Sequence, residues 1–338
     1  MISDAVKAIV AGSDLSDAEV EAAMDAILGG EASPAQIAAF VVGLRMKGES
    51  ASEIAAAARA LRKHCEAIRP KVDGPLLDTC GTGGDGLHTF NISTAAAIVA
   101  ASCGVAVAKH GNRAVSSKAG SADVLEALGV RIDLPPDRVA KSIEEVGIGF
   151  MFAPSHHAAM KHAAPVRREL GVRTLFNLLG PLSNPASATH QVVGVYDPTR
   201  LEQLAQALGA LGLTAAWVVH GEGGLDEVSP AGPTRVAQLD AGEVTSFEVS
   251  PSDFGLVEVP LEALGGGDAS LNATIIRSVL EGEQGAARSA VVLNAAAALQ
   301  VAGLASDPLA AAERAAAAID RGDAKEKLER WAAFTRGT

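Results

Sequence analysis

Aromatic residues are scarce in this chain of 338 residues, where eight Phe, two Trp and one Tyr make up 3% of the sequence. A core with so few rings must be built from aliphatic side chains, as in helices packed on a sheet of Val, Ile and Leu. Hydrophobic residues still account for 48% of the chain and charged residues for only 20%, and this balance excludes a disordered protein. The length corresponds to two domains of about 150 residues each.

Three other shortages narrow the class of protein. Only three cysteines occur, Cys65, Cys80 and Cys103, without the C-x-x-C spacing of a zinc site, which disfavours a disulfide framework and fits a reducing compartment. The most apolar stretch, residues 94–108, is too short to span a bilayer, and residues 1–20 predict an amphipathic helix rather than a signal peptide. Forty acidic and 28 basic residues give a net charge of -12, which argues against broad binding of nucleic acid or an anionic membrane. We therefore expect a soluble cytoplasmic protein.

Residues 1–70 show helical patterns only. Three of the expected helices begin at capping boxes: Ser16 with Glu19, Ser33 with Gln36, and Ser50 with Glu53. In a capping box, the serine side chain accepts a hydrogen bond from a backbone N–H of the first turn, and the Glu or Gln side chain accepts one from the backbone N–H of the serine. Glycines predict where helices end, at Gly29–Gly30 and at Gly48. Helical spacing of apolar residues, as in Ile37, Phe40, Val41 and Leu44, gives each helix one apolar stripe. We predict a small N-terminal α-helical domain over residues 1–70 that packs or dimerises.

The pattern changes after a linker over residues 70–75. Short β-like runs alternate with helical stretches, as in a largely parallel sheet: Leu76–Cys80, Val105–Lys109, Ile148–Phe152, Gln191–Tyr196 and Ala215–His220. A hairpin follows over Thr234–Leu239 and Val244–Val249, and the tail from Ser270 is helical. We predict an α/β domain over residues 71–338 with a mainly parallel central sheet. A helical segment near residues 165–185 is expected to pack on the first domain.

The strongest local signal is a glycine-rich segment after the first predicted strand. Gly81, Gly83 and Gly86 satisfy the G-x-G-x-x-G pattern, which by itself predicts a dinucleotide site. Such a site requires an acid about 20 residues later to hold the ribose hydroxyls. The next strand ends instead in Lys109–Arg113, which holds two cations and a histidine, so an NAD site is disfavoured. The loop still suits phosphate groups, because glycines let backbone N–H groups approach oxyanions.

Two stretches of this acidic chain are almost free of acids. No Asp or Glu lies between Asp85 and Asp123, and Glu169 is the only acid in residues 146–196. The basic residues in these stretches are Lys109, Arg113, Lys118, Lys161, Arg167, Arg168 and Arg173. Together with serines, glycines and Asn91–Thr94, they predict a pocket for a polyanionic small molecule. A solvated basic face, or a helix merely capped by Ser93 or Thr94, is the alternative.

Two adjacent acids, Asp226 and Glu227, lie in a glycine-rich loop that follows a predicted strand and could complement the basic pocket. Mg²⁺ sites commonly use one or two carboxylates, with substrate phosphates and water as the other ligands. We therefore expect Mg²⁺ at this pair, with a solvated acidic loop as the alternative.

Taken together, these motifs resemble the anthranilate phosphoribosyltransferase family of tryptophan biosynthesis over nearly the whole chain. The resemblance rests on Gly81–Asp85, Asn91–Thr94, Lys109–Arg113, Gly120–Asp123, Pro165–Gly171, Arg173–Pro185, Asp226–Glu227 and Leu293–Leu299. It implies a helical domain joined to an α/β domain, and a homodimer formed through the helical part. It also implies transfer of phosphoribose from phosphoribosyl pyrophosphate (PRPP) to the amino group of anthranilate, with release of pyrophosphate.

The resemblance further implies roles for individual residues. PRPP contacts fall on Gly81, Gly84, Asp85, Thr89, Asn91, Ile92, Ser93, Thr94, Lys109, His110, Gly111, Asn112, Arg113, Ser116, Ser117 and Ser121. Anthranilate contacts fall on Gly81, His110, Asn112, Arg167 and Pro181, and Mg²⁺ ligands fall on Ser93, Asp226 and Glu227. One departure from the family is Ala158, where a proline is common; it concerns loop rigidity rather than chemistry.

The implied mechanism needs no covalent nucleophile and no general base. Positive charge builds on the sugar as pyrophosphate leaves, and the attacking aromatic amine is already neutral at pH 7, so positioning and electrostatics dominate. Whether His110 orients substrate or accepts a proton stays open. Two alternative functions are a pyrimidine nucleoside phosphorylase, which needs no carboxylate clamp for Mg²⁺ and pyrophosphate, and a nucleic-acid-binding paralogue, which the net charge disfavours.

Overall fold

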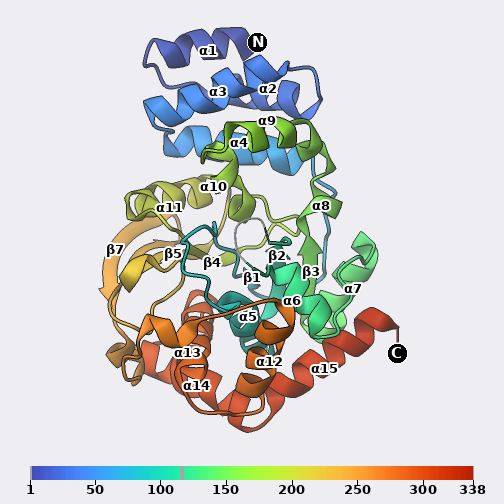
Figure 1. Ribbon diagram of the computed structural model, residues 1–338, viewed down its shortest axis with the longest axis vertical. Coiled ribbons are helices and arrows are strands. Elements are labelled where there is room, and N and C mark those ends of the chain that lie inside the picture. The colour runs from blue at the N-terminus through green and yellow to red at the C-terminus, as the bar shows by residue number, and fades with distance from the viewer. Residues whose placement is uncertain (1, 115–117, 338) are drawn as a thin grey trace.

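The computed structural model describes residues 2–114 and 118–337 (Figure 1). The first four helices form one end of the molecule: α1 (Ile2–Val10), α2 (Asp17–Leu28), α3 (Pro34–Lys47) and α4 (Ala51–Lys63). All three predicted capping boxes are confirmed, at the starts of α2, α3 and α4. The predicted ends at Gly29 and Gly48 are confirmed as well, because these residues are the C-caps of α2 and α3.

The helix predicted over residues 1–20 is not continuous, and its second part begins at the predicted Ser16 capping box. The chain leaves α1 at Val10 and turns through Gly12, whose φ is 78°, and α2 begins only after Ser16. A positive φ suits glycine and interrupts the helix, while the capping box of Ser16 starts a new one. The apolar periodicity on both sides of the turn is real, but it belongs to two helices.

Seven strands form one sheet: β1 (Leu76–Asp78), β2 (Ala106–Gly111), β3 (Ile148–Phe152), β4 (His190–Gly194), β5 (Ala215–Gly221), β6 (Thr234–Asp240) and β7 (Glu243–Val249). Their spatial order is β3-β2-β1-β4-β5-β6-β7. Strands β1 to β5 pair in parallel, whereas β6 pairs antiparallel with both β5 and β7. The predicted mainly parallel sheet and its hairpin are thus confirmed.

Helices cover both faces of this sheet (Figure 1). The helices that follow β1 in the chain are α5 (Ile92–Ser102), α6 (Ser121–Ala127), α7 (Pro136–Val146), α8 (Ala153–His156), α9 (Ala164–Leu170), α10 (Leu175–Leu182), α11 (Leu201–Ala210), α12 (Ala269–Leu280), α13 (Ala286–Val301), α14 (Pro308–Asp320) and α15 (Asp323–Arg336). Short 3₁₀ segments are η1 (Ala158–His162), η2 (Pro198–Arg200), η3 (Glu222–Gly224), η4 (Pro251–Phe254) and η5 (Leu261–Leu264). Within the described residues, no helix is long and apolar enough to cross a membrane.

The core is aliphatic, as the composition predicts. On one face of the sheet, Val107 and Val192 share a buried cluster with Ile98 of α5 and Val291 of α13. On the other face, α11 packs on β5 and β6, and α7 packs on β3. Helices therefore shield the strands on both sides, as parallel sheets require.

The helices α9 and α10 lie against the N-terminal helices rather than against the sheet alone (Figure 1). Val166 of α9 and Leu178 of α10 belong to the same buried cluster as Phe40 of α3 and Ile54 of α4. Residues 164–182 thus connect the helical end of the molecule to the α/β part.

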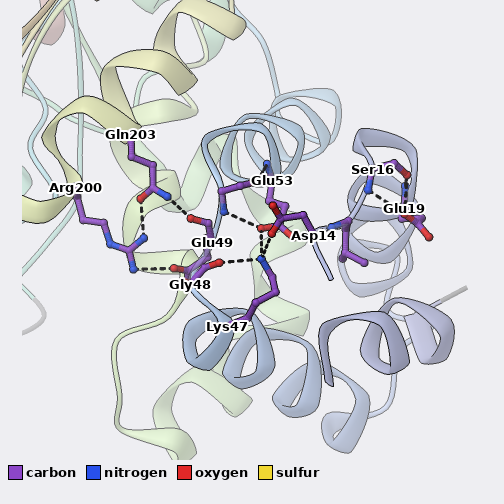
Figure 2. Close-up of polar contacts among 11 residues, drawn as sticks. Asp14, Ser16, Glu19, Lys47, Gly48, Glu49, Glu53, Arg200 and Gln203 are labelled. Atoms are coloured by element: carbon purple, nitrogen blue, oxygen red, sulfur yellow. Dashed lines mark hydrogen bonds and ion pairs between the residues drawn. The ribbon is translucent and has the colours of Figure 1, made fainter. Parts of the chain in front are cut away.

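Figure 2 shows a polar network that also joins these two parts of the chain. Lys47 Nζ lies 2.9 Å from Glu53 Oε2, and both side chains are almost completely buried. Arg200 of η2 lies 2.8 Å from the carboxylate of Glu49, and the Gln203 side chain donates to the carbonyl oxygen of Glu49. This network joins the turn before α4 to the beginning of α11. Removing one partner of a buried pair would leave the other charge buried without a partner, which is costly.

The strand order reverses at β1, since β2 and β3 lie on one side of it and β4 and β5 on the other. In open parallel sheets, ligands bind beyond the carboxyl ends of the strands at such a switch point. The segments that leave these ends of β1, β2 and β4 start at residues 79, 112 and 195. The predicted glycine loop is one of them, so the topology directs attention to this edge.

Candidate active site

The glycine loop, residues 81–86, follows β1 and lies against the end of β4. The Thr82 N–H donates to the carbonyl oxygen of Gly194 at 2.9 Å. Gly83 and Gly84 have positive φ values of 66° and 88°, which glycine adopts without a steric penalty. With no side chains in the way, an anion can approach the backbone N–H groups of this loop. Its conformation therefore suits phosphate oxygens.

The start of α5 lies beside the loop that carries Asp226 and Glu227, here called the acidic loop. The Ser93 N–H donates to Glu227 Oε1 at 3.1 Å, which joins segments 134 residues apart. Asn91 is the N-cap of α5 without a side-chain cap, so neither Ser93 nor Thr94 caps this helix. Ile92 and Thr94 are buried, whereas Asn91 and Ser93 keep exposed surface. Asn91 and Ser93 are therefore better placed for a ligand than the other two predicted contacts.

Asp226 and Glu227 follow β5 on a loop that packs closely on the end of β4. A Cβ at Gly194 would lie 1.5 Å from the carbonyl oxygen of Asp226, so this approach requires glycine. Burial raises the pKa of Glu227 to about 7, although the Lys109 ammonium opposes the rise. Burial also raises the pKa of Asp226 well above its ordinary value, and the carboxylates of Glu227 and Asp85 raise it further. The two carboxylates are thus crowded together and only partly exposed.

Lys109 lies in β2 with its side chain buried next to the start of the glycine loop. Its ammonium donates to the carbonyl oxygen and the hydroxyl of Thr79, at 3.2 and 3.1 Å. The same charge lowers the pKa of Glu227 and of Asp78 relative to the effect of burial alone. Lys109 thus places a positive charge at the carboxyl ends of the parallel strands, near both the start of the glycine loop and the carboxylate of Glu227.

Two residues that position this edge were missed at the level of sequence. Asp78, at the end of β1, accepts from the His110 N–H at 3.1 Å and from Asn184 Nδ2 at 2.7 Å. Burial raises the pKa of Asp78 to about 6, with the Lys109 charge and the Asn184 hydrogen bond opposing it. The signal for Asp78 is an acid that ends an apolar strand, and Asn184 belongs to the Arg173–Pro185 motif.

His110 is buried beside α10. Its Nδ1 lies 3.1 Å from the carbonyl oxygen of Gly180 and therefore carries the proton, while Nε2 has no hydrogen-bond partner among the described residues. The His157 ring meets it edge-on, with the ring centres 5.1 Å apart. Burial lowers the pKa of His110 well below its ordinary value, so the ring is neutral at pH 7. Pro181 follows Gly180 within α10, so two predicted anthranilate contacts lie close together.

Arg167 lies in α9 and contacts a residue of α10. Its guanidinium lies 5.5 Å from the centre of the Phe176 ring, and burial lowers its pKa. An arginine stays charged even so, because its ordinary pKa is far above neutrality. Arg167 is therefore a half-buried, planar positive charge on α9.

The segment between β2 and α6 differs in part from expectation. Arg113 lies 2.7 Å from Asp123 and 2.6 Å from Glu126, so acids of α6 already balance its charge. The Ser121 hydroxyl donates to the Asn112 carbonyl at 3.4 Å, and a Cβ at Gly111 would lie 2.2 Å from Ser121 Oγ. The structure thus brings together four predicted PRPP contacts: Gly111, Asn112, Arg113 and Ser121. Thr89 is not part of this segment and forms an isolated antiparallel β-bridge with Gly265. Ser116 and Ser117 lie outside the described residues.

Comparison with known proteins places this arrangement in a family. A glycosyl transferase family matches at its α/β domain over residues 73–325 and at its helical bundle domain over residues 3–65. The anthranilate phosphoribosyltransferase of Myxococcus xanthus (strain DK1622) is 54% identical over 328 residues, which cover 97% of each chain. The chain belongs to the anthranilate phosphoribosyltransferase family.

Solved structures of this family share the fold. The crystal structure of the Thermus thermophilus enzyme covers 98% of this chain, and this chain covers 99% of it, with 48% identity and a TM-score of 0.94. The Saccharomyces cerevisiae enzyme in complex with PRPP and Mg covers 100% of this chain, and 98% of it is covered, at 28% identity and a TM-score of 0.91. Another structure of the yeast enzyme holds 4-fluoroanthranilate.

The acidic loop fits the magnesium that this family uses. Asp85 Oδ2 is buried without a hydrogen-bond partner in the described part of the chain, and its carboxylate faces those of the acidic loop. Uncompensated negative charge of this kind is relieved by a cation. The described residues hold no cluster of three or more side chains able to ligate a metal by themselves. Two carboxylates with substrate oxygens and water suit Mg²⁺, which keeps several non-protein ligands.

Proposed function

We propose that this chain transfers the phosphoribosyl group of PRPP to the amino group of anthranilate, giving N-(5-phosphoribosyl)anthranilate and pyrophosphate. The observation that carries the proposal is the meeting, at the β1 switch point, of an open glycine loop, a buried lysine and a carboxylate pair. A phosphate donor, its metal and a cation for the leaving group are then accommodated at one edge of the sheet.

In the proposed reaction, the bond between ribose C1 and pyrophosphate breaks, a new bond to the anthranilate nitrogen forms, and that nitrogen releases one proton to solvent. Ser93, Asp226 and Glu227 would hold Mg²⁺, which would supply charge neutralisation for the pyrophosphate. Lys109 adds a positive charge that is fixed in place by Thr79, and the glycine loop offers backbone N–H groups. The chain thus works by holding two substrates in line, since the amine needs no activation.

The neutral His110 fits an orienting role. Its Nδ1 proton is engaged by the Gly180 carbonyl oxygen, which leaves Nε2 as an acceptor toward the anthranilate side. An acceptor of this kind can hold the amine proton in place without acting as a strong base. The proposal therefore includes no general base.

The test follows the loss of anthranilate fluorescence in the presence of PRPP and Mg²⁺. We expect a loss that requires all three components and a stoichiometric release of pyrophosphate. Fluorescence that persists at every enzyme concentration would overturn the proposed function.

Arg167 is proposed to hold the anthranilate carboxylate. A guanidinium can grip a carboxylate through two parallel hydrogen bonds, and a charged hydrogen bond contributes about 1.5–3 kcal/mol. Arg167→Ala should therefore raise the anthranilate KM about 10- to 150-fold and leave the PRPP KM nearly unchanged. Steady-state kinetics with each substrate varied in turn measures both. A collapse of PRPP binding with intact anthranilate binding would assign this role to another base.

We also propose a cytoplasmic homodimer formed through the helical end of the chain. Val10 of α1 and Met46 of α3 are 79% and 83% exposed, although α1 and α3 pack on each other. Light scattering should give twice the mass of the chain, and Met46→Glu should shift the population toward monomer, because a charge is costly in an apolar contact. A fully active wild-type monomer at micromolar concentration would contradict the dimer.

A further inference from the structure

One cation that the resemblance does not name as a substrate contact touches the glycine loop. Arg173 lies between α9 and α10, and its guanidinium donates to the carbonyl oxygen of Gly84. A Cβ at Gly84 would lie 3.1 Å from Arg173 Nη2, so the loop and the guanidinium are in direct contact. The guanidinium also stacks on the ring of Tyr196, 3.6 Å from its centre. Tyr196 follows β4 and is the only tyrosine of the chain.

The glycine loop benefits from such a contact because four of its six residues are glycines, and only Thr82 and Asp85 have side chains that can anchor it. Gly83, Gly84 and Gly86 all have positive φ, and glycine has more backbone freedom to lose on ordering than any other residue. One end of the loop is held by the Thr82 contact with Gly194. Arg173 reaches the middle of the loop from a different segment, so it restricts the residues that are freest.

The partners of Arg173 explain why an arginine stands there. A guanidinium is planar, so it can lie flat on a tyrosine ring and still direct N–H groups toward the loop at its edge. One carbonyl oxygen occupies one of its five N–H donors. A lysine ammonium is a point charge on a flexible stem and lacks the stacked geometry.

We propose that Arg173 is a positioning residue that fixes the glycine loop in the conformation that receives the diphosphate end of PRPP, with Tyr196 holding the guanidinium in place. This inference rests on the proposed function for the identity of the ligand. It assigns Arg173 an effect on PRPP capture rather than on the bond-breaking step, because the guanidinium acts through the Gly84 backbone.

The kinetic test compares matched variants of the full-length protein. Arg173→Met keeps the length of the side chain but loses charge and stacking, and should raise the PRPP KM about 5- to 30-fold while kcat and the anthranilate KM change less than about twofold. Arg173→Lys should restore only part of this loss. Tyr196→Leu should raise the PRPP KM about 2- to 5-fold, and Tyr196→Phe should match the wild type.

The control is Arg321→Met, which removes the same charge from an exposed position at the end of α14, where the side chain pairs with Asp323. It should leave every kinetic constant unchanged. If Arg321→Met and Arg173→Met behave alike, or if Arg173→Met lowers kcat and raises both KM values together, the positioning role is overturned.

A second measurement does not depend on the reaction. Hydrogen exchange of the amides of residues 82–87 in the substrate-free protein should be faster in Arg173→Met than in the wild type and unchanged in Arg321→Met. Lack of activity in the wild type would overturn the proposed function while leaving this readout intact. Unchanged exchange in Arg173→Met would overturn the positioning role while leaving the proposed function intact.

Discussion

Replacing Asp226 by asparagine and Glu227 by glutamine together is expected to lower the rate about 100-fold at moderate Mg²⁺, because two ligand charges are lost while shape is kept. The fold should survive. Glutamine still offers Ser93 an acceptor oxygen in place of Glu227 Oε1, and the crowding of carboxylates that raises the pKa of Asp226 disappears. Higher Mg²⁺ should recover part of the activity, since a weakened site fills by mass action.

The measurement is a Mg²⁺ titration of the rate, with thermal unfolding of each protein recorded beside it. The matched control is Asp240→Asn with Glu243→Gln, which changes the net charge equally on the exposed turn between β6 and β7. That turn lies at the opposite edge of the sheet, where Asp240 pairs with the first residue of β5. Superimposable titrations of the wild type and the Asp226/Glu227 variant would remove the metal role from these acids.

Much of this fold could be predicted because it is written in local patterns. The short β-like runs predicted the strands of the sheet to within one or two residues, and the serine capping boxes predicted the starts of α2, α3 and α4. Periodicity failed at Gly12, where two helices share one continuous pattern across a turn. The division of the chain at residue 70 and the homodimer remain predictions.

The site was harder to predict because long-range contacts decide it. Arg113 has the charge expected of a phosphate contact, but the fold places two acids of α6 beside it. Asp78 and Asn184 are 106 residues apart, and only the folded chain shows that they share a buried hydrogen bond. The same holds for Arg173 and Gly84, which are 89 residues apart. Sequence motifs named the segments that meet at the site, but not which side chains inside them are already engaged.

Gly194→Ala is the single substitution expected to damage the site most. The added Cβ would lie 1.5 Å from the Asp226 carbonyl oxygen and 2.3 Å from its carbonyl carbon. Both are backbone atoms, so the acidic loop must move as a unit, and the Thr82 contact with the Gly194 carbonyl must adjust as well. We expect kcat/KM to fall about 100-fold or more, because a misplacement near 1 Å costs about that much. Overpacking should also reduce the free energy of unfolding by about 1–3 kcal/mol.

This loss differs from that of the Asp226/Glu227 variant in its response to magnesium. Displaced carboxylates keep their charge but lose their alignment with the glycine loop, so a Mg²⁺ titration should recover little of the rate. Gly209→Ala is the control, because its Cβ would meet only the end of the Leu239 side chain, 3.1 Å from Cδ1 and 3.8 Å from Cδ2, and no backbone atom of another segment. Alanine inside α11 is favoured over glycine by about 0.8–1 kcal/mol, so this variant should keep full activity and unfold no earlier than the wild type. Wild-type kinetics in Gly194→Ala would show that the close approach of the acidic loop to β4 is not required for the reaction.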